Sequence, residues 1–202
     1  NGEIYNFQKI KNLLLKKGYQ FKSSGDTEVL LKAWIEWREE AIEKLDGMFA
    51  FSIWDKKEKT LFLARDRFGK KPLIYSSKNN RFSFASDIMS LKQLQDGGDV
   101  SKEAIKSLFR FRCIYEPLTI FENFRKLPPG SFLIYNRYGV KVSKYYDLSK
   151  KSQGALYNKD TVEKDITDLI LKSVDKRLDV DVPLGVFLSG GIDSGLILSA
   201  LA

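Results

Sequence analysis

The chain lacks histidine altogether and contains a single cysteine, Cys113. Without histidine, no Ser/His/Asp or Cys/His nucleophilic arrangement can form within it, and the usual His/Cys zinc sites are also excluded. One cysteine cannot form an internal disulfide, which fits a reducing compartment. We therefore expect a cytoplasmic protein with no disulfide framework and no structural zinc.

Long hydrophobic runs are also missing, because no apolar stretch approaches the roughly 20 residues that a membrane-spanning helix needs. The first residues, Asn1 to Ile4, do not form the basic and then apolar pattern of a signal peptide. We expect no membrane partner. Since the chain does not begin with methionine, we interpret Asn1 as a processed end or the edge of a fragment.

The charge is uneven along the chain. The net charge is +8, yet residues 160–202 hold eight acidic and four basic side chains, so the rest carries about +12. The lysines of the first part are scattered and do not gather into an arginine-rich face. This pattern is typical of a solvated surface, so we expect no nucleic-acid partner.

The chain holds 202 residues, 43% of them hydrophobic and 13% aromatic, enough for a packed core. Apolar periodicity predicts two early helices, a β-rich middle with two helices inside it, and a late hairpin. The predicted helices are 7–17, 27–37 with Asp26 as N-cap, 88–94 and 102–111. The predicted extended segments are 19–22, 49–54 with 60–66 across a 55–59 loop, 73–75 with 81–85 across a 76–80 loop, and 132–135 with 140–143.

A polar stretch of small residues, 149–155, reads as a linker. An amphipathic helix is predicted from Val162 to Leu178. A buried strand, 184–188, then runs into the sequence SGGIDS at 189–194, and a last helix follows Asp193.

A strand, the sequence Ser-Gly-Gly-x-Asp-Ser and a helix make a phosphate-binding arrangement. Gly190 and Gly191 let the backbone turn sharply and bring N–H groups close to an anion, while Ser189 and Ser194 add hydroxyl donors. The following helix directs its positive end to the same place. Asp193 would repel phosphate, so we expect it to hold Mg²⁺ or to fix the loop. A tight turn without a ligand would need only one glycine.

The loop does not fit the kinase-type pattern, because Gly191 occupies the position that requires lysine. It resembles instead the loop of the ATP pyrophosphatases, which cut ATP between the α and β phosphates. Several motifs of the first part follow in a fixed order. Together with the loop, they resemble glutamine-hydrolysing asparagine synthetase nearly end to end. These motifs are NGEIYN at 1–6, GDTEV at 25–29, GMFAF at 47–51, ARDRFGKKPL at 64–73 and LPPG at 127–130.

This resemblance implies two domains. Residues 1–150 would be a glutamine amidotransferase domain, an α+β αββα sandwich of the N-terminal-nucleophile type that is truncated at its start. Residues 151–202 would begin an α/β ATP-pyrophosphatase domain. The family hydrolyses glutamine to glutamate and ammonia, converts aspartate with ATP and Mg²⁺ to an aspartyl adenylate, and forms asparagine, AMP and pyrophosphate. A homodimer is compatible with the resemblance.

The resemblance also assigns roles to residues. Asn1 and Gly2 correspond to the family's oxyanion hole, although Asn-Gly is also a turn signal. Asn1, Gly2, Glu3 and Asp26 match residues that bind glutamine, where a carboxylate suits the α-ammonium group. Phe187 falls where the family often places an apolar residue against adenine, but it is equally a strand-end core residue. For ATP and pyrophosphate the positions are Ser189, Gly190, Gly191, Asp193 and Ser194, with Asp193 also for Mg²⁺.

Some of the family pattern has no match in the sequence. The family's nucleophile is an N-terminal cysteine, and Cys113, at the end of a predicted helix, reads as a buried or idle thiol. The segment 65–72 reads as a hairpin junction with solvated bases. We therefore expect an internal fragment that is inactive alone. Open alternatives are an amidotransferase with another acceptor, such as the β-lactam synthetase type or a glycan- or peptide-modifying enzyme, a nucleic-acid-binding relative, and a non-catalytic relative.

Overall fold

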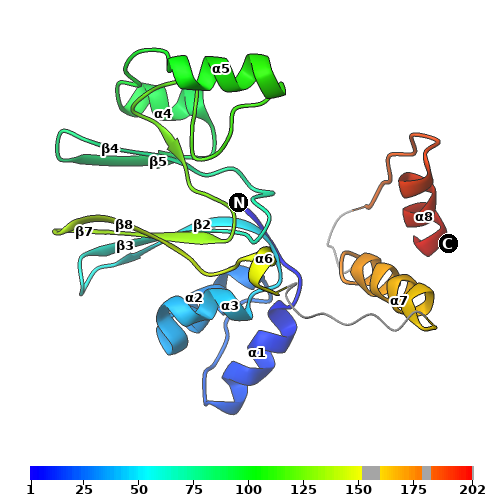
Figure 1. Ribbon diagram of the computed structural model, residues 1–202. Helices are drawn as coiled ribbons and strands as arrows, with labels where there is room; N and C mark the ends of the chain where they lie inside the picture. The colour runs from blue at the N-terminus through cyan, green and yellow to red at the C-terminus, as the bar shows by residue number, and fades with distance from the viewer. Residues whose placement is uncertain (152–159, 179–182, 202) are drawn as a thin grey trace. The chain divides into compact units, whose positions relative to one another are not determined.

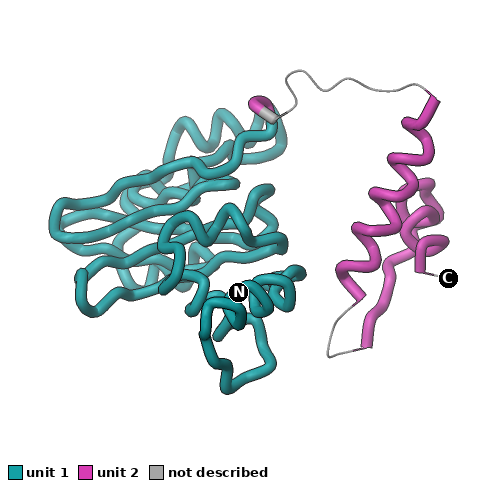
Figure 2. Tube along the Cα trace, turned by 90° about the horizontal axis from the view of Figure 1, so that it is seen from below, with its two compact units in different colours: residues 1–148 teal, residues 149–202 magenta. Residues whose placement is uncertain are grey.

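The computed structural model describes residues 1–151, 160–178 and 183–201. The chain divides into two units, Asn1–Leu148 and Ser149–Ala202 (Figure 2). We describe each unit by itself. In the described part of the chain, no helix combines the length and the apolar character needed to cross a bilayer.

The first unit is built on two antiparallel sheets. One has five strands in the order β1-β2-β3-β7-β8, and the other has three in the order β5-β4-β6. The strands of the larger sheet are β1 (Gly2–Ile4), β2 (Gly47–Asp55), β3 (Thr60–Arg65), β7 (Ser131–Asn136) and β8 (Gly139–Lys144). The strands of the smaller sheet are β4 (Ile74–Lys78), β5 (Arg81–Ala85) and β6 (Arg125–Lys126).

Helices cover the outer face of each sheet (Figure 1). The larger sheet is covered by α1 (Phe7–Lys16), α2 (Asp26–Trp37), a 3₁₀ turn (Arg38–Glu40) and α3 (Ala41–Lys44). Against the smaller sheet lie α4 (Ile88–Leu94) and α5 (Lys102–Phe111). The order helix, sheet, sheet, helix confirms the expected αββα sandwich.

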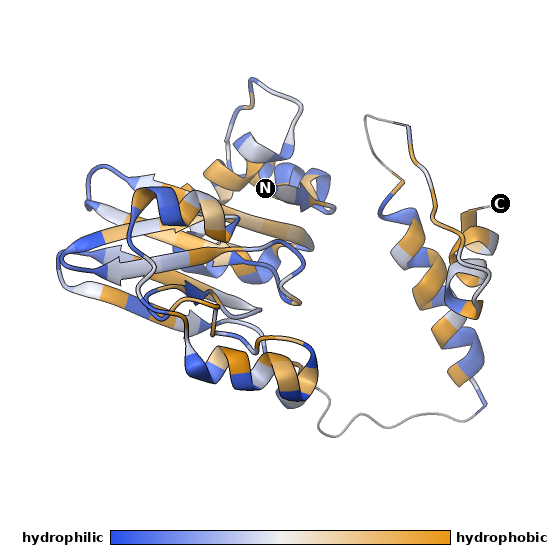
Figure 3. Cartoon of the chain, turned by 90° about the horizontal axis from the view of Figure 1, so that it is seen from above, coloured by the Kyte–Doolittle hydropathy of each residue, from blue (hydrophilic) through white to orange (hydrophobic). Residues whose placement is uncertain are grey.

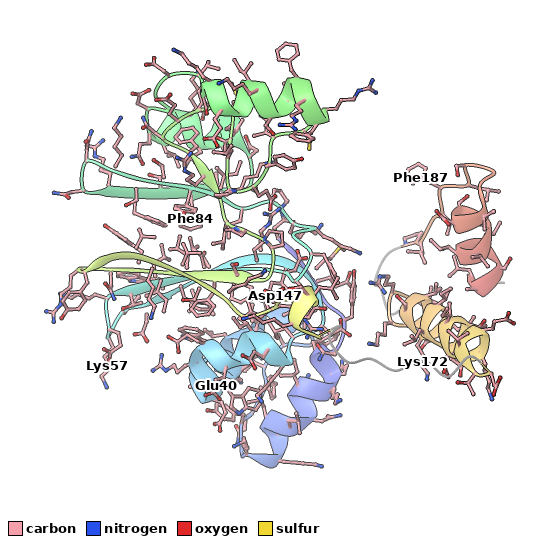
Figure 4. All side chains as sticks on the ribbon, in the orientation of Figure 1. Glu40, Lys57, Phe84, Asp147, Lys172 and Phe187 are labelled. Atoms are coloured by element: carbon pink, nitrogen blue, oxygen red, sulfur yellow. The ribbon has the colours of Figure 1, made fainter. Side chains whose placement is uncertain are left out.

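Three apolar cores separate these four layers. Ile10, Ala33 and Phe62 belong to the core between the first helices and the larger sheet. Between the sheets, the ring of Phe82 stacks on that of Tyr135 with centroids 4.5 Å apart. Figure 4 shows Phe84 projecting into the same layer. A small third core lies between the smaller sheet and α4. The alternation of apolar residues along the strands therefore fills both faces of the larger sheet.

Several predictions from the sequence need correction. The loop predicted at 76–80 is mostly strand, because β4 continues to Lys78 and only Asn79 and Asn80 form the turn, with φ of 53° and 57°. Asparagine tolerates this left-handed backbone, which two-residue hairpin turns require. Residues 19–22 form no strand. Cys113 is exposed, so of the two readings of its thiol, buried or idle, the buried one was wrong.

Among the described residues of the second unit, the regular structure consists of the end of one short helix and two longer helices. The beginning of the predicted linker lies in the short helix α6 (Leu148–Lys151), and residues 152–159 lie outside the described residues. The amphipathic helix is confirmed as α7 (Val162–Asp175) and the last helix as α8 (Ile192–Leu201). Both helices carry exposed apolar side chains (Figure 3).

The buried strand predicted at 184–188 was wrong. Residues 183–189 form no regular structure and are exposed. A strand takes its hydrogen bonds from neighbouring strands, and no other strand lies among the described residues of 149–202. The apolar run 184–188 therefore has no strand to pair with among those described residues.

Candidate functional site

The strand β1 brings the first motif of the chain against β2. Gly2 pairs with Phe49 and Glu3 pairs with Met48. Next to this ladder, the backbone nitrogen of Asn1 donates to the Ala50 carbonyl at 3.1 Å, and the Ala50 N–H donates to the Asn1 carbonyl at 2.8 Å. The backbone of Asn1 to Ile4 is therefore fixed along one strand.

Gly2 is required by the closeness of this pairing. A Cβ atom on Gly2 would lie 2.0 Å from the Met48 carbonyl oxygen and 2.6 Å from the Phe49 Cα. Its φ of +127° is also a conformation that residues with side chains rarely adopt. Gly2 thus lies in β1, with Asn1 directly before it, and the turn reading does not apply.

Asp26 ties the helix α2 to β1. Its Oδ2 accepts a hydrogen bond from the Ile4 N–H at 3.1 Å, and its Oδ1 accepts one from the Thr27 hydroxyl at 3.3 Å. Asp26 is the first residue of α2, and Gly25 holds the N-cap position without a side-chain cap. The N-cap role expected for Asp26 was therefore wrong, because its carboxylate is taken by a more distant backbone donor.

These residues surround one pocket of about 520 Å³. Asn1, Gly2, Glu3 and Asp26 all line it, so the structure brings together every residue that the sequence assigned to glutamine. Glu3 and Asp26 supply two carboxylates, and Ser23, Thr27 and Ser52 supply hydroxyls. The other lining residues are Ile4, Glu28, Leu30, Leu31, Phe49, Phe51 and Ile53. A pocket with an apolar wall and carboxylates suits an amino acid, whose ammonium group needs a negative partner.

Glu28 also lines this pocket, and the sequence analysis gave it no role. Its carboxylate accepts hydrogen bonds from the N–H groups of Lys22 and Ser23 and from the Ser23 hydroxyl, at 2.7 to 3.1 Å. Lys32, one turn later, forms an ion pair with it at 2.6 Å. The Lys32 hydrogen bond and then those from Ser23 lower the pKa of Glu28 to about 2. Capping glutamates typically occupy the third position of a helix, which Glu28 holds in α2, so its place near the helix start could have indicated this role.

The segment 65–72 was expected to be a hairpin junction with solvated bases. The structure shows instead a folded loop around two buried side chains, Arg65 and Asp66. Asp66 is 1% exposed and accepts hydrogen bonds from the N–H groups of Phe49, Phe68, Lys70 and Lys71 at 3.0 to 3.3 Å. A buried carboxylate needs hydrogen-bond partners, and these four backbone donors supply them. Asp66 therefore sets the shape of this loop.

Arg65 closes the same loop from the other side. Its guanidinium is almost fully buried, pairs with Glu116 at 2.9 Å and donates to the carbonyls of Gly69, Lys71 and Leu127. The Tyr145 hydroxyl donates to the Arg65 carbonyl at 2.9 Å. Burial, followed by the nearby Asp66 charge, raises the pKa of Tyr145. Sequence alone gave no sign that these two charges are internal.

In the second unit, the loop 189–194 is closed by Ser194. Its hydroxyl accepts from the Ser189 N–H at 3.3 Å, donates to the Gly191 carbonyl at 3.1 Å and lies 3.0 Å from the Ser189 hydroxyl. Gly190 has a φ of +79°, which allows the sharp turn. Among the described residues, the N–H groups of Ile192 and Asp193 in the first turn of α8 have no acceptor. These free donors and the helix end favour an anion.

Asp193 and Phe187 flank this loop. Asp193 is an exposed residue in the first turn of α8, and no group of three or more metal-binding side chains occurs in the described ranges. Phe187 is 99% exposed, so it is not a core residue in this structure, and Figure 4 shows it extending away from α8. The structure thus keeps the predicted loop residues together while leaving Phe187 without contacts to a core.

Comparison with known proteins gives matches along nearly the whole chain. A family model described as "Glutamine amidotransferase domain" matches residues 1–146, and one described as "Asparagine synthase" matches residues 165–202. Asparagine synthetase (glutamine-hydrolyzing) 1 of Bacillus subtilis is 41% identical over 98% of this chain and 31% of the relative. Asparagine synthetase (glutamine-hydrolyzing) 3 of the same organism is 34% identical over 100% of this chain and 33% of the relative. The chain spans about a third of the length of these relatives.

Among solved structures, glutamine phosphoribosylpyrophosphate amidotransferase from B. subtilis matches 98% of this chain and 42% of that chain. The TM-score is 0.50 at 18% identity, which bears on the fold alone. The first family model covers well over half of the residues and coincides with the αββα unit that holds the pocket. The chain therefore belongs to the glutamine amidotransferase domain family.

Proposed function

We propose that this chain is part of a glutamine-hydrolysing asparagine synthetase. The observation that carries the proposal is the presence, in one chain, of two chemically different sites. One is a carboxylate-lined pocket at β1 and α2, and the other is a glycine-serine loop at the start of α8. In the proposed reaction, glutamine yields ammonia at the first site, and ATP activates aspartate at the second.

The pocket at β1 and α2 is the proposed glutamine site. The Asn1 side-chain amide and the Gly2 N–H would stabilise the oxyanion that develops when the glutamine amide is attacked. Glu3 and Asp26 would hold the α-ammonium group. In this family the nucleophile is an N-terminal cysteine. We do not assign Cys113 to that role, because it follows α5 and does not line the pocket.

The loop 189–194 is the proposed site for ATP and its leaving pyrophosphate. Ser189, Gly190, Gly191 and Ser194 would donate hydrogen bonds to phosphate oxygens, and Phe187 would lie against the adenine. Mg²⁺ usually takes one or two carboxylates and completes its shell with phosphate oxygens and water. One exposed carboxylate, Asp193, beside free N–H donors fits that requirement. The ion would offset the negative charge of the triphosphate.

This proposal also assigns the two units of the chain. Residues 1–150 would form the glutaminase domain, and residues 151–202 would begin the synthetase domain. The proposal assigns no residue of this chain to aspartate.

The test is to assay the full-length protein with glutamine, aspartate, ATP and Mg²⁺ and to follow glutamate, asparagine, AMP and pyrophosphate together. We expect asparagine to form with one AMP and one pyrophosphate for each molecule. Formation of glutamate without asparagine would contradict aspartate as the acceptor and favour an amidotransferase that acts on another substrate. The absence of glutamate would contradict the glutaminase assignment itself.

A further inference from the structure

The loop that precedes α2 forms one wall of the pocket at β1 and α2. Ser23 of this loop lines the pocket, and Gly25 leads directly into Asp26, whose carboxylate binds the Ile4 N–H. The loop contains no strand or helix of its own. Its backbone groups therefore need other partners to keep a single conformation.

Glu28 supplies those partners. Its carboxylate binds the two consecutive N–H groups of Lys22 and Ser23, and Ser23 Oγ donates to it at 2.8 Å. In a capping box the third helical residue reaches back to the N-cap N–H. Here the N-cap is Gly25, and Glu28 reaches two and three residues further back, to Ser23 and Lys22. One side chain of α2 thus holds the loop on which the start of α2 depends.

Two lysines, Lys32 and Lys11, complete the arrangement. The Glu28 carboxylate is paired with Lys32, whose ammonium group also lies 4.3 Å from the centre of the Phe21 ring. Lys11, from α1, lies over the same ring and donates to the Ser23 carbonyl at 3.4 Å. Both the N–H and the carbonyl of Ser23 are therefore held, the first by Glu28 and the second by Lys11.

We infer that Glu28 is a positioning residue for substrate binding in this pocket. It acts by fixing residues 22–25 and, through them, the place of the Asp26 carboxylate. This inference rests on the proposed glutaminase function. Glu28 is not assigned to contact glutamine, because its carboxylate already accepts four donors. Since its pKa is lowered to about 2, the carboxylate keeps its charge and its hydrogen bonds at any ordinary assay pH.

Glu36 offers a matched control on the same helix. Its carboxylate also binds a lysine, Lys17, at 2.7 Å, and a hydroxyl, that of Tyr19, at 3.0 Å. Glu36 does not line the pocket. Glu28→Ala and Glu36→Ala therefore remove comparable interactions from α2, and only the first removes the anchor of the loop.

The experiment measures kcat and KM for glutamine hydrolysis in the full-length protein and its Glu28→Ala, Glu28→Gln and Glu36→Ala variants. Small displacements in a site cost rate and affinity steeply, so we expect Glu28→Ala to raise the KM for glutamine about tenfold. The kcat should change less than about threefold, because the reacting groups are untouched. Glu28→Gln keeps one acceptor oxygen and should give an intermediate KM. Glu36→Ala should stay within about twofold of the unaltered protein.

Two further readings separate positioning from general loss of structure. Synthesis driven by ammonia in place of glutamine should be unchanged in all three variants, since it bypasses the pocket. If Glu28→Ala does not fold, the KM of Glu28→Gln for glutamine is compared with that of Glu36→Ala instead. Equal KM values for the Glu28 and Glu36 variants would overturn the inference while leaving the proposed function intact. Failure of the unaltered protein to hydrolyse glutamine would overturn both.

Discussion

The Asp26 carboxylate accepts a hydrogen bond from the Ile4 backbone N–H at 3.1 Å, so the first residue of one helix is attached to the last residue of β1. The two residues come from motifs that lie 22 positions apart in the chain. This contact brings a carboxylate to β1, which carries Gly2 and directly follows Asn1. This hydrogen bond joins the start of α2 to the end of β1 at the pocket.

The first prediction concerns the charge of Asp26. Asp26→Asn keeps an oxygen that can accept from Ile4 but removes the negative charge proposed to face the ammonium group. We expect the KM for glutamine to rise about 10- to 100-fold, as for the loss of a charged hydrogen-bond partner. Asp55→Asn, which removes a carboxylate paired with Arg38, is the control and should leave KM unchanged. A similar KM for both variants would contradict the assignment.

The second prediction concerns the close approach at Gly2. Gly2→Ala places a methyl group where the Met48 carbonyl oxygen lies, so β1 must separate from β2. We expect a destabilisation of about 3 kcal/mol or more, measured by thermal and denaturant unfolding of the full-length protein. Gly139→Ala is a useful comparison, because Gly139 also has a positive φ but nothing lies within 4 Å of its Cβ position. The loss of stability in Gly139→Ala should be clearly smaller. Equal losses of stability in the two variants would rule out the clash at Gly2.

The third prediction concerns acid stability. The folded pKa of Glu28 is lowered from 4.5 to about 2, so its contribution to stability is present above about pH 4.5 and is lost as the pH falls towards 2. We expect the Tm difference between the unaltered protein and Glu28→Gln to be constant at neutral pH and to shrink between pH 4.5 and pH 2. A Tm difference that stays constant through this range would show that the carboxylate is not held as described.

The fourth prediction concerns the loop before α8. Ser194→Ala removes the hydroxyl that bridges Ser189 and Gly191, so the loop loses its closing contact. We expect kcat/KM for ATP to fall about tenfold, equivalent to about 1.4 kcal/mol, while glutamine hydrolysis is retained. Ser199→Ala on the same helix removes only a hydrogen bond to the Gly195 carbonyl and serves as control. Equal effects of the two variants on ATP kinetics would argue against a phosphate role for the loop.

Local patterns in the sequence predicted much of the fold. The helices α4 and α5 have the bounds 88–94 and 102–111 that were predicted from the sequence, and in the structure Asp87 and Ser101 cap their starts by accepting a backbone N–H. The hairpin of β7 and β8 was predicted from alternating residues around a turn with Gly139. In such segments, the information lies within a few residues of the chain.

Long-range contacts explain what the sequence could not predict. Asp26 was predicted to be an N-cap from its place at a helix start. The local pattern could not reveal its actual partner, the Ile4 N–H, which lies 22 residues away in the chain. Arg65 and Asp66 looked solvated because charges usually are, and the backbone donors and acceptors that allow their burial come from segments up to 62 residues away. The strand expected at 184–188 failed for a related reason, since strands need partners that a local pattern does not supply.

Phe49 contacts both the strand at the pocket and the loop 66–71. On one side it pairs with Gly2 in the wall of the pocket. Its N–H donates to the Asp66 carboxylate, and its carbonyl accepts the Asp66 N–H at 2.8 Å. The backbone of Phe49 therefore binds both β1 at the pocket and the loop 66–71. A displacement of that loop must either break a bond to Asp66 or move the strand on which Gly2 lies.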